Sequence, residues 1–182
     1  DKLEGALADF GVDPTGKICL DVGSSTGGFT DCLLQHGAAR VMAVDVTISQ
    51  LAWKLQQDAR VTLIEANARY LLPSALSAAP ALITIDVSFI SVAKVLPTVA
   101  ALAATLADFL ILVKPQFELE RGQVGSGGIV RDPALRERAV EKVSEAARSI
   151  GLEIRGVRRS RVLGAEGNQE IFLYARGAAR QG

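Results

Sequence analysis

A glycine-rich run, DVGSSTGGF at residues 21–29, follows the first apolar segment of the sequence. A glycine turn between a strand and a helix lies at the carboxyl edge of an open α/β sheet, where nucleotide-like ligands bind. The dinucleotide pattern needs glycine at position 25, where this sequence has serine, and no Gly-Lys-Ser/Thr follows to form a phosphate loop. The run therefore favours an adenosine ligand without phosphates over NAD or a nucleoside triphosphate.

Two aspartates accompany this turn. Asp21 precedes it, and Asp45 closes the next apolar segment, near the position from which a carboxylate accepts hydrogen bonds from ribose hydroxyls. Their negative charge suits a ligand that carries an ammonium and a sulfonium, which is S-adenosylmethionine. The residues expected to bind it are Asp21, Gly23, Ser24, Ser25, Gly27, Gly28 and Asp45. The alternative is a turn that only packs a helix on a strand.

Three more charged residues stand at the ends of apolar segments. Lys114 follows FLILV, Asp86 follows ALITI, and Glu170 precedes IFLY. Like strand ends would bring Asp86 and Lys114 into one ligand crevice, where each controls the protonation of the other, and Glu170 could bind the ammonium of Lys2 or of Lys114. The alternatives are a Lys114 that extends into water, an Asp86 that caps a helix, and an exposed Glu170 at a strand edge.

Alternating apolar and amphipathic segments must position these residues. They predict an α/β fold with a mostly parallel sheet that is covered by helices on both faces. The expected strands are 17–22, 40–46, 61–65, 81–86 and 109–114, and the expected helices are 27–36, 49–57 and 91–106. A glycine-containing loop then leads to Asp132 as the N-cap and Pro133 as the first residue of a helix over 134–150 that stops at Gly151. Segments 152–157 and 170–174 predict two late strands, which could form an antiparallel hairpin at one edge.

The composition is that of one folded domain, with 182 residues and 20 basic and 20 acidic side chains. Zero net charge argues against global attraction to nucleic acid, but Arg155, Arg158, Arg159 and Arg161 could meet phosphates or could only protect an edge strand. The sequence has one histidine, His36, which we expect to cap a helix end, and two cysteines, Cys19 and Cys32, which we expect to be buried. These residues offer no metal site and no Ser-His-Asp triad.

Neither a membrane span nor a signal peptide is readable. The longest charge-free stretch, residues 70–85, contains two prolines and is shorter than the roughly 20 apolar residues that cross a bilayer. We expect a soluble, cytoplasmic protein without integral membrane association. Because Met42 is the sole methionine, we also expect a chain that begins after its initiator, with a segment upstream.

Several motifs together resemble the TlyA family of ribosomal RNA 2'-O-methyltransferases, which have an FtsJ-like catalytic domain and of which some carry the name hemolysin. The motifs cover essentially the whole chain and occur in order: DVGSSTGGFTD (21–31), AVDV (43–46), QLAWKL (50–55), NAR (67–69), DVSFIS (86–91), VKPQFE (113–118), VGSGGIVRDP (124–133) and GNQE (167–170).

The resemblance implies a Rossmann-like class I methyltransferase fold with seven strands over residues 1–182, and S-adenosylmethionine as methyl donor. It also implies a catalytic set of Lys2, Asp86, Lys114 and Glu170, with Asn67 and Asp86 among the cofactor-binding residues. The implied partners are ribosomal RNA or ribosomal subunits, and a small S4-like RNA-binding domain is expected upstream.

Methyl transfer to a ribose hydroxyl needs a residue that activates or orients this very weak acid. Lys114 is the best candidate, either as a lysine that burial has deprotonated or as a cation that orients the hydroxyl. Two rival functions stay open, a membrane-lytic hemolysin and a small-molecule O-methyltransferase on the same fold. No long amphipathic segment supports the first of them.

Overall fold

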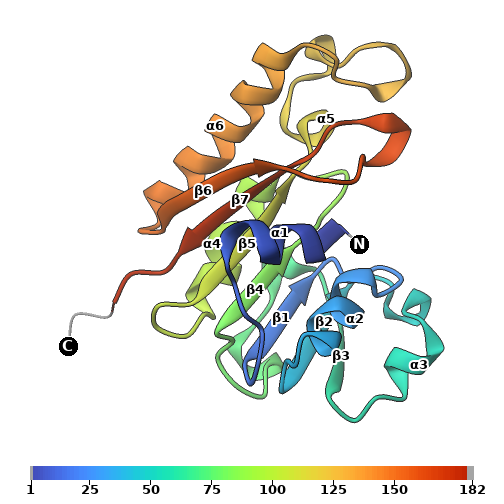
Figure 1. Ribbon diagram of the computed structural model, residues 1–182, viewed down its shortest axis with the longest axis vertical. Coiled ribbons are helices and arrows are strands. Elements are labelled where there is room, and N and C mark those ends of the chain that lie inside the picture. The colour runs from blue at the N-terminus through green and yellow to red at the C-terminus, as the bar shows by residue number, and fades with distance from the viewer. Residues whose placement is uncertain (1, 180–182) are drawn as a thin grey trace.

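Seven strands form one mixed sheet in the computed structural model, which describes residues 2–179 (Figure 1). Their order is β3-β2-β1-β4-β5-β7-β6; β7 is antiparallel to both its neighbours, and the strands from β1 to β5 pair in parallel. The strands are β1 Ile18–Val22, β2 Arg40–Asp45, β3 Val61–Glu65, β4 Leu82–Ile85, β5 Asp108–Val113, β6 Glu153–Arg159 and β7 Ile171–Arg176. The predicted mostly parallel sheet and the antiparallel hairpin at its edge are confirmed.

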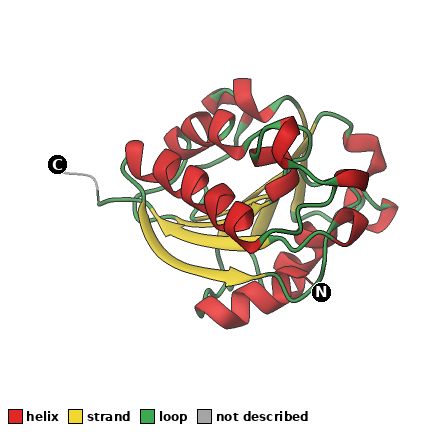
Figure 2. Cartoon of the chain, turned by 90° about the horizontal axis from the view of Figure 1, so that it is seen from above, coloured by secondary structure: helices red, strands yellow, loops and turns green. Residues whose placement is uncertain are grey.

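Helices cover both faces of this sheet (Figure 2). The α-helices are α1 Lys2–Phe10, α2 Gly28–Gln35, α3 Trp53–Gln56, α4 Leu96–Ala101, α5 Pro115–Glu118 and α6 Pro133–Ser149. The short 3-10 helices are η1 Ile48–Gln50, η2 Ala68–Tyr70, η3 Pro73–Ala75, η4 Val92–Lys94, η5 Arg121–Gln123, η6 Ser126–Gly128 and η7 Ala165–Gly167.

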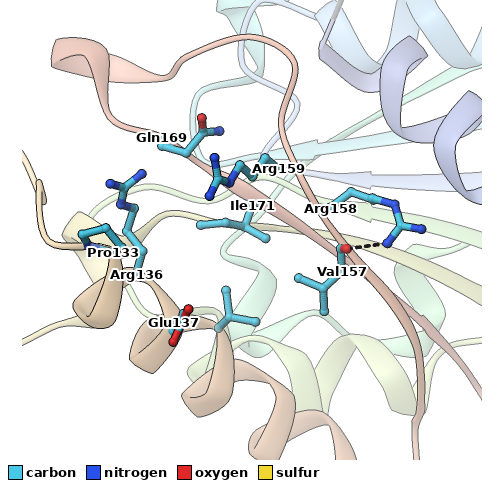
Figure 3. A pocket seen from close by; sticks show the side chains of 9 residues that line it. Pro133, Arg136, Glu137, Val157, Arg158, Arg159, Gln169 and Ile171 are labelled. Atoms are coloured by element: carbon cyan, nitrogen blue, oxygen red, sulfur yellow. Dashed lines mark hydrogen bonds between the residues drawn. The ribbon is translucent and has the colours of Figure 1, made fainter.

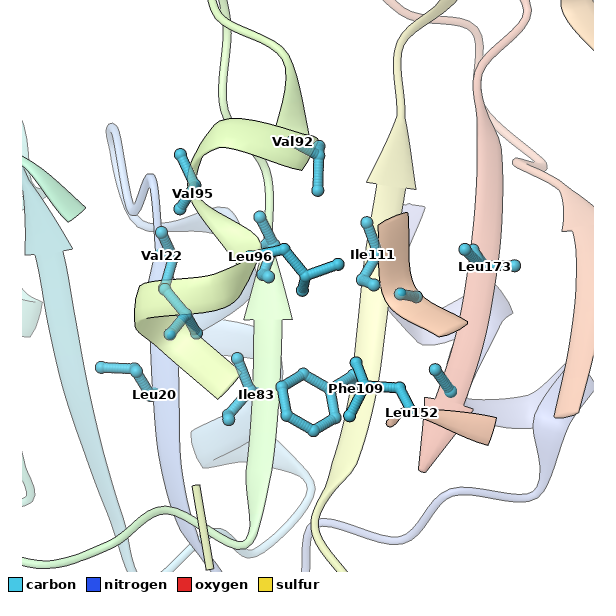
Figure 4. Packing of buried hydrophobic residues seen from close by; sticks show 14 of the residues in the cluster. Leu20, Val22, Ile83, Val92, Val95, Leu96, Phe109, Ile111, Leu152 and Leu173 are labelled. Carbon is cyan, nitrogen blue, oxygen red and sulfur yellow. The ribbon is translucent and has the colours of Figure 1, made fainter. Parts of the chain in front are cut away.

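Two hydrophobic cores lie on opposite sides of the sheet. On one side α4 and α6 pack on the strands, with Leu96 of α4 close to Ile83 of β4 and Ile111 of β5 (Figure 4). On the other side α1 and α2 contribute Leu3 and Leu33. Strands buried on both faces must be apolar at nearly every position, which explains the unbroken hydrophobic runs in the sequence.

Two predicted helices are shorter than expected. The helix expected over 91–106 is split into η4 and α4, because Pro97 has no amide hydrogen with which to continue the helical bonding. The helix expected over 49–57 is split into η1 and α3, because Leu51 and Ala52 adopt extended backbone angles and the Ala52 amide donates to the Thr26 carbonyl.

Helix α1 was not among the predicted elements. Its buried side chains Leu3, Ala6 and Leu7 have the i, i+3, i+4 spacing of an amphipathic helix, so the signal was present in the sequence.

The predicted ends of α2 and α6 are confirmed. The Asp132 carboxylate accepts a hydrogen bond from the Ala134 amide, Pro133 opens α6, and Gly151 follows it with a φ of +88°. His36 caps α2 through its ring Nδ1, 2.8 Å from the Cys32 carbonyl oxygen.

The prediction that both cysteines are buried is also confirmed. Burial raises the pKa of Cys19 to about 12 and that of Cys32 to about 11, so both stay as thiols at neutral pH.

Candidate functional site

A cavity of about 580 Å³ lies at the carboxyl edge of the sheet, where the loops after the strands from β1 to β5 converge. Its polar lining consists of Ser25, Asp45, Gln50, Asn67, Asp86, Ser88 and Lys114. This volume lies within the range of small-molecule sites, and the position is where open α/β sheets bind ligands. We call this cavity the crevice.

The glycine turn after β1 forms one wall of the crevice, but only part of it is exposed there. Gly23 and Ser25 line the crevice, and Gly23 has a φ of +81°. A Cβ at Gly23 would overlap the carbonyl oxygen of Asp86, so only glycine allows β1 and β4 to end this close together. Ser24, Gly27 and Gly28, which were expected to bind the cofactor, do not line the crevice. Gly27 instead lies beneath the side chains of Leu51 and Leu55.

Asp21, which was expected among the cofactor-binding residues, does not line the crevice. It is fully buried behind the turn, where its carboxylate accepts hydrogen bonds from the hydroxyls of Thr30 at 2.7 Å and Thr84 at 2.9 Å. Burial raises its pKa to about 6, although the two hydroxyls partly oppose the shift. Asp21 therefore holds α2 and β4 together beneath the turn, where none of its side chain is exposed.

Asp45 and Asn67 lie on the wall of the crevice formed by the ends of β2 and β3. The Asp45 carboxylate accepts hydrogen bonds from the Ser25 amide at 2.8 Å and from the Thr47 amide at 3.1 Å. The side-chain oxygen of Asn67 accepts from the Arg69 amide, while its amide nitrogen makes no hydrogen bond within residues 2–179. Both side chains are therefore fixed by the backbone where they line the crevice, and the Asn67 amide nitrogen is left there without a partner in the described residues.

Lys114 and Asp86 meet on the opposite wall. The Lys114 Nζ lies 2.5 Å from Asp86 Oδ1 and donates a hydrogen bond to the Ser88 hydroxyl at 2.9 Å. Only 13% of the lysine side chain and 24% of the aspartate side chain are exposed. The sequence-based expectation that β4 and β5 bring these two charges into one crevice is borne out by this geometry.

Lys2 and Glu170 form a second ion pair at the same edge of the sheet. The Lys2 Nζ donates to Glu170 Oε1 at 2.8 Å, and 2% of the glutamate side chain is exposed. Glu170 immediately precedes β7, which pairs Ile171 with Val113, so residues 170 and 114 are next to each other in the antiparallel register. Of the two lysines that Glu170 could have bound, the structure selects Lys2, which α1 carries across the sheet.

Two buried side chains fix the loops around these pairs. Glu118 accepts hydrogen bonds from the Ser91 hydroxyl at 2.6 Å and the Val92 amide at 2.9 Å, which ties the loop after β5 to the loop after β4. Asn168 accepts from the Val130 amide at 2.9 Å and donates to the carbonyls of Gly128 and Ala165. The motifs VKPQFE and GNQE therefore build the scaffold of the edge as well as supplying charges to it.

Ser88 and Phe89 line the crevice without having a predicted role. Ser88 accepts the hydrogen bond from Lys114, and Phe89 is 90% exposed with a φ of +64°, a backbone conformation that costs energy for a bulky residue. The Phe89 ring contacts that of Phe117 in a tilted arrangement, with centroids 4.9 Å apart and ring planes at 53°. Both residues belong to the DVSFIS motif, so the motif contained a signal but no chemical reason to single them out.

Comparison with known proteins decides the family of the chain. The sequence model described as FtsJ-like methyltransferase matches residues 1–177. The chain belongs to the FtsJ-like methyltransferase family.

Relatives of this FtsJ-like chain include rRNA methyltransferases by name. It is 49% identical over 96% of its length to the 16S/23S rRNA (cytidine-2'-O)-methyltransferase TlyA of Mycobacterium tuberculosis. It is 44% identical over 96% of its length to Hemolysin A of Brachyspira hyodysenteriae, of which it covers 73%. The chain spans 66% of the TlyA protein, about two thirds of its length.

Solved structures agree with the fold of this FtsJ-like methyltransferase. A hemolysin-named protein from Streptococcus thermophilus superposes with a TM-score of 0.94 at 42% identity, over 97% of this chain and 65% of that one. An S-adenosylmethionine-dependent methyltransferase from Listeria monocytogenes has a TM-score of 0.70 at 13% identity, over 97% of both chains, which supports the Rossmann-like class I fold alone. Within residues 2–179, no helix is both long and apolar enough to cross a membrane.

Proposed function

We propose that this chain is the catalytic domain of an S-adenosylmethionine-dependent 2'-O-methyltransferase that acts on ribosomal RNA. The observation that carries the proposal is the ion pair between Lys114 and Asp86, because it sits in the wall of a crevice of suitable size for an adenosine compound. A cation held there can orient the hydroxyl of an alcohol acceptor, and a carboxylate beside it can accept the proton.

The residues of the crevice fit S-adenosylmethionine. The Asp45 carboxylate is placed to accept hydrogen bonds from ribose hydroxyls, and the free amide nitrogen of Asn67 is a donor for an adenine or ribose acceptor. Asp86 adds a negative charge that suits an ammonium or a sulfonium. S-adenosylmethionine supplies an electrophilic methyl group when bound.

Lys114 would hold the acceptor oxygen. The Lys114 ammonium is paired with the Asp86 carboxylate and donates one of its three N–H bonds to Ser88, so it can still donate to a substrate hydroxyl. The acceptor proton must leave as its oxygen is methylated, and the Asp86 carboxylate is the base closest to the lysine that holds that oxygen. The geometry favours an orienting lysine in an ion pair over an isolated neutral lysine.

Lys2 and Glu170 would set the charge around this centre. Glu170 is almost fully buried and would be an uncompensated charge without Lys2. Glu170 is next to Lys114 in the register of β5 and β7. The pair therefore places one cation and one anion beside Lys114, and its own net charge is zero.

Ribosomal RNA is favoured as the acceptor over a small molecule. The relatives from M. tuberculosis and Campylobacter jejuni are named for methylation of cytidine 2'-hydroxyls in rRNA. Phe89, which is exposed at the rim of the crevice, offers a flat surface of the kind on which RNA bases stack. With these relatives in view, we also propose that the domain acts in the cytoplasm and that an S4-like RNA-binding domain precedes it.

A methyl-transfer assay tests the proposal. The protein and labelled S-adenosylmethionine are incubated in separate reactions with isolated small ribosomal subunits, with large subunits, or with a catechol. Lysis of liposomes by the protein is measured in a further experiment. We expect label in ribosomal RNA, none in the catechol and no lysis. Binding of the cofactor without label in either subunit would refute the proposed acceptor, and lysis that survives Lys114→Ala would favour a hemolysin.

A further inference from the structure

A second cavity, of about 360 Å³, lies between α6 and β6, away from the crevice (Figure 3). Arg136 and Glu137 come from α6, Arg158 and Arg159 from β6, and Gln169 from the segment before β7. Its floor is apolar and is formed by Val140, Val157 and Ile171. We call this cavity the arginine groove.

The three arginines of the groove have no carboxylate partner within residues 2–179. Arg136 donates to the Arg131 carbonyl at 3.0 Å, and its buried Nε has no acceptor in that part of the chain. The Arg158 side chain donates to the Val157 carbonyl at 2.9 Å, and the Arg159 side chain makes no hydrogen bond or ion pair in that part of the chain. Three positive charges and the one negative charge of Glu137 leave the groove positive in a chain of zero net charge.

The other two arginines of the cluster expected from the sequence are neutralised. Arg155 lies 3.6 Å from Glu153, and Arg161 lies 2.6 Å from Asp9 of α1. If the arginines of this edge strand served only to prevent aggregation, an arginine paired with a carboxylate would serve as well as an unpaired one. The three arginines that line the cavity have no carboxylate partner in the described residues, and the side chains of Arg136 and Arg159 point toward one another there (Figure 3), whereas the two paired arginines do not line it.

The groove adjoins the residues of the proposed catalytic edge. Gln169 and Ile171 line it, while Glu170 between them pairs with Lys2 on the other face of the sheet. In Figure 3 the side chains of Arg136, Arg159 and Gln169 gather at this end of the groove. Glu170 of the proposed site is therefore the direct sequence neighbour of two residues that line the groove.

We propose that the arginine groove binds a single-stranded segment of the RNA substrate that flanks the methylated nucleotide. The inference rests on the proposed function. Guanidinium groups bind phosphates with two parallel hydrogen bonds, and the apolar floor offers a surface for a ribose or an unstacked base. A free phosphate would use the arginines but not the floor, so the combination favours a nucleotide chain.

Binding of a fluorescein-labelled, single-stranded RNA 20-mer by the 182-residue chain tests the inference at several salt concentrations. Arg136→Gln and Arg159→Gln each remove one positive charge from the groove. Arg40→Gln is the matched control, because Arg40 is exposed and starts β2, which lies next to the edge strand β3 on the far side of the sheet from β6. Arg159→Lys keeps the charge and tests whether charge is what matters. Thermal midpoints confirm that each variant is folded.

We expect each groove variant to weaken RNA binding about 5- to 10-fold and to reduce the slope of log K against log salt by about 0.7, the value for one lost phosphate contact on a single strand. Arg40→Gln should change neither quantity, and Arg159→Lys should retain most of the slope. Groove variants that bind like Arg40→Gln, or a chain that does not bind the RNA, would overturn the inference. The assay involves no methyl transfer, so groove-dependent binding by a chain that cannot methylate ribosomal subunits would refute the proposed function alone.

Discussion

Lys114 Nζ lies 2.5 Å from Asp86 Oδ1, although the two residues are 28 positions apart and follow different strands. The contact exists because β4 and β5 pair in parallel, with Ile85 opposite Ile111, and end at the same edge of the sheet. Ser88 and the segment fixed by Glu118 hold the two charged groups in place. A pair positioned by so many separate elements is costly to build, which supports its role in the chemistry.

The first prediction concerns Asp45 and the cofactor. Asp45→Asn should raise the dissociation constant for S-adenosylmethionine about 10-fold or more, because hydrogen bonds to a charged acceptor contribute roughly 1.5–3 kcal/mol each. Calorimetric titration measures it. Glu65→Gln, an exposed change at the end of neighbouring β3, is the control and should bind normally. If both variants bound S-adenosylmethionine with equal affinity, Asp45 would not be a cofactor-binding residue.

The second prediction concerns the asymmetry of the Lys2–Glu170 pair. Lys2→Met should lower the free energy of unfolding by about 3 kcal/mol, since it leaves an almost fully buried carboxylate unpaired. Glu170→Gln should cost about 1 kcal/mol, because the partly exposed lysine stays solvated and the amide still accepts its hydrogen bond. Urea unfolding measures both values, and the reverse order would show that the pair does not carry a buried charge.

The third prediction is a pH dependence due to Asp21. Its pKa is raised to about 6 by burial, so the folded state holds the proton more tightly than the unfolded chain, in which the pKa is near 3.8. Asp21 therefore favours folding most at low pH, and this contribution is lost as the pH rises from about 4 to about 6, by roughly 2–3 kcal/mol in total.

The readout for Asp21 is the difference in unfolding free energy between the wild type and Asp21→Asn, because other carboxylates titrate in both proteins. The free energy of unfolding of the wild type should fall relative to that of Asp21→Asn as the pH rises from 4.5 to 7. A constant difference over this range would mean that Asp21 keeps an ordinary pKa in the fold.

The fourth prediction concerns Asn168 and the glycine loop. Asn168→Ala removes three hydrogen bonds of a side chain that is 1% exposed, and should cost about 2–4 kcal/mol. Hydrogen exchange at the Val130 amide should accelerate in this variant. Asn168→Asp keeps the acceptor for Val130 and should protect that amide better. Equal exchange in all three proteins would mean that another contact orders the loop.

The architecture was predictable from the sequence because buried strands and capped helices have local signatures. The apolar runs of β1, β4 and β5 and the cap at Asp132 are examples of such signatures. The split of the helix expected over 91–106 needed only the rule that proline removes a donor, applied to Pro97. The break between η1 and α3 was not predictable locally, because it depends on packing of Leu51 and Leu55 over Gly27.

The site was predictable in part. Residue type and position at a strand end were enough to bring Asp86 and Lys114 together, because parallel strands share their carboxyl edge. The same reasoning did not show that Asp21 is buried behind the turn and does not line the crevice, because the direction of its side chain depends on Thr30 and Thr84. The choice of Lys2 as the partner of Glu170 depends on how α1 crosses the sheet, which no local pattern shows.

The role of Lys114 in ribosomal RNA methylation is tested most directly by mapping blocked 2'-hydroxyls after isolated subunits are incubated with S-adenosylmethionine and one of three proteins. These are the wild type, Lys114→Ala, and Lys94→Ala as an exposed control. We expect a defined modified nucleotide with the wild type and Lys94→Ala, and a loss of at least about 100-fold in rate with Lys114→Ala, while cofactor binding is retained. Full methylation by Lys114→Ala, or no blocked hydroxyl with the wild type, would refute the proposed function of the pair of Lys114 and Asp86.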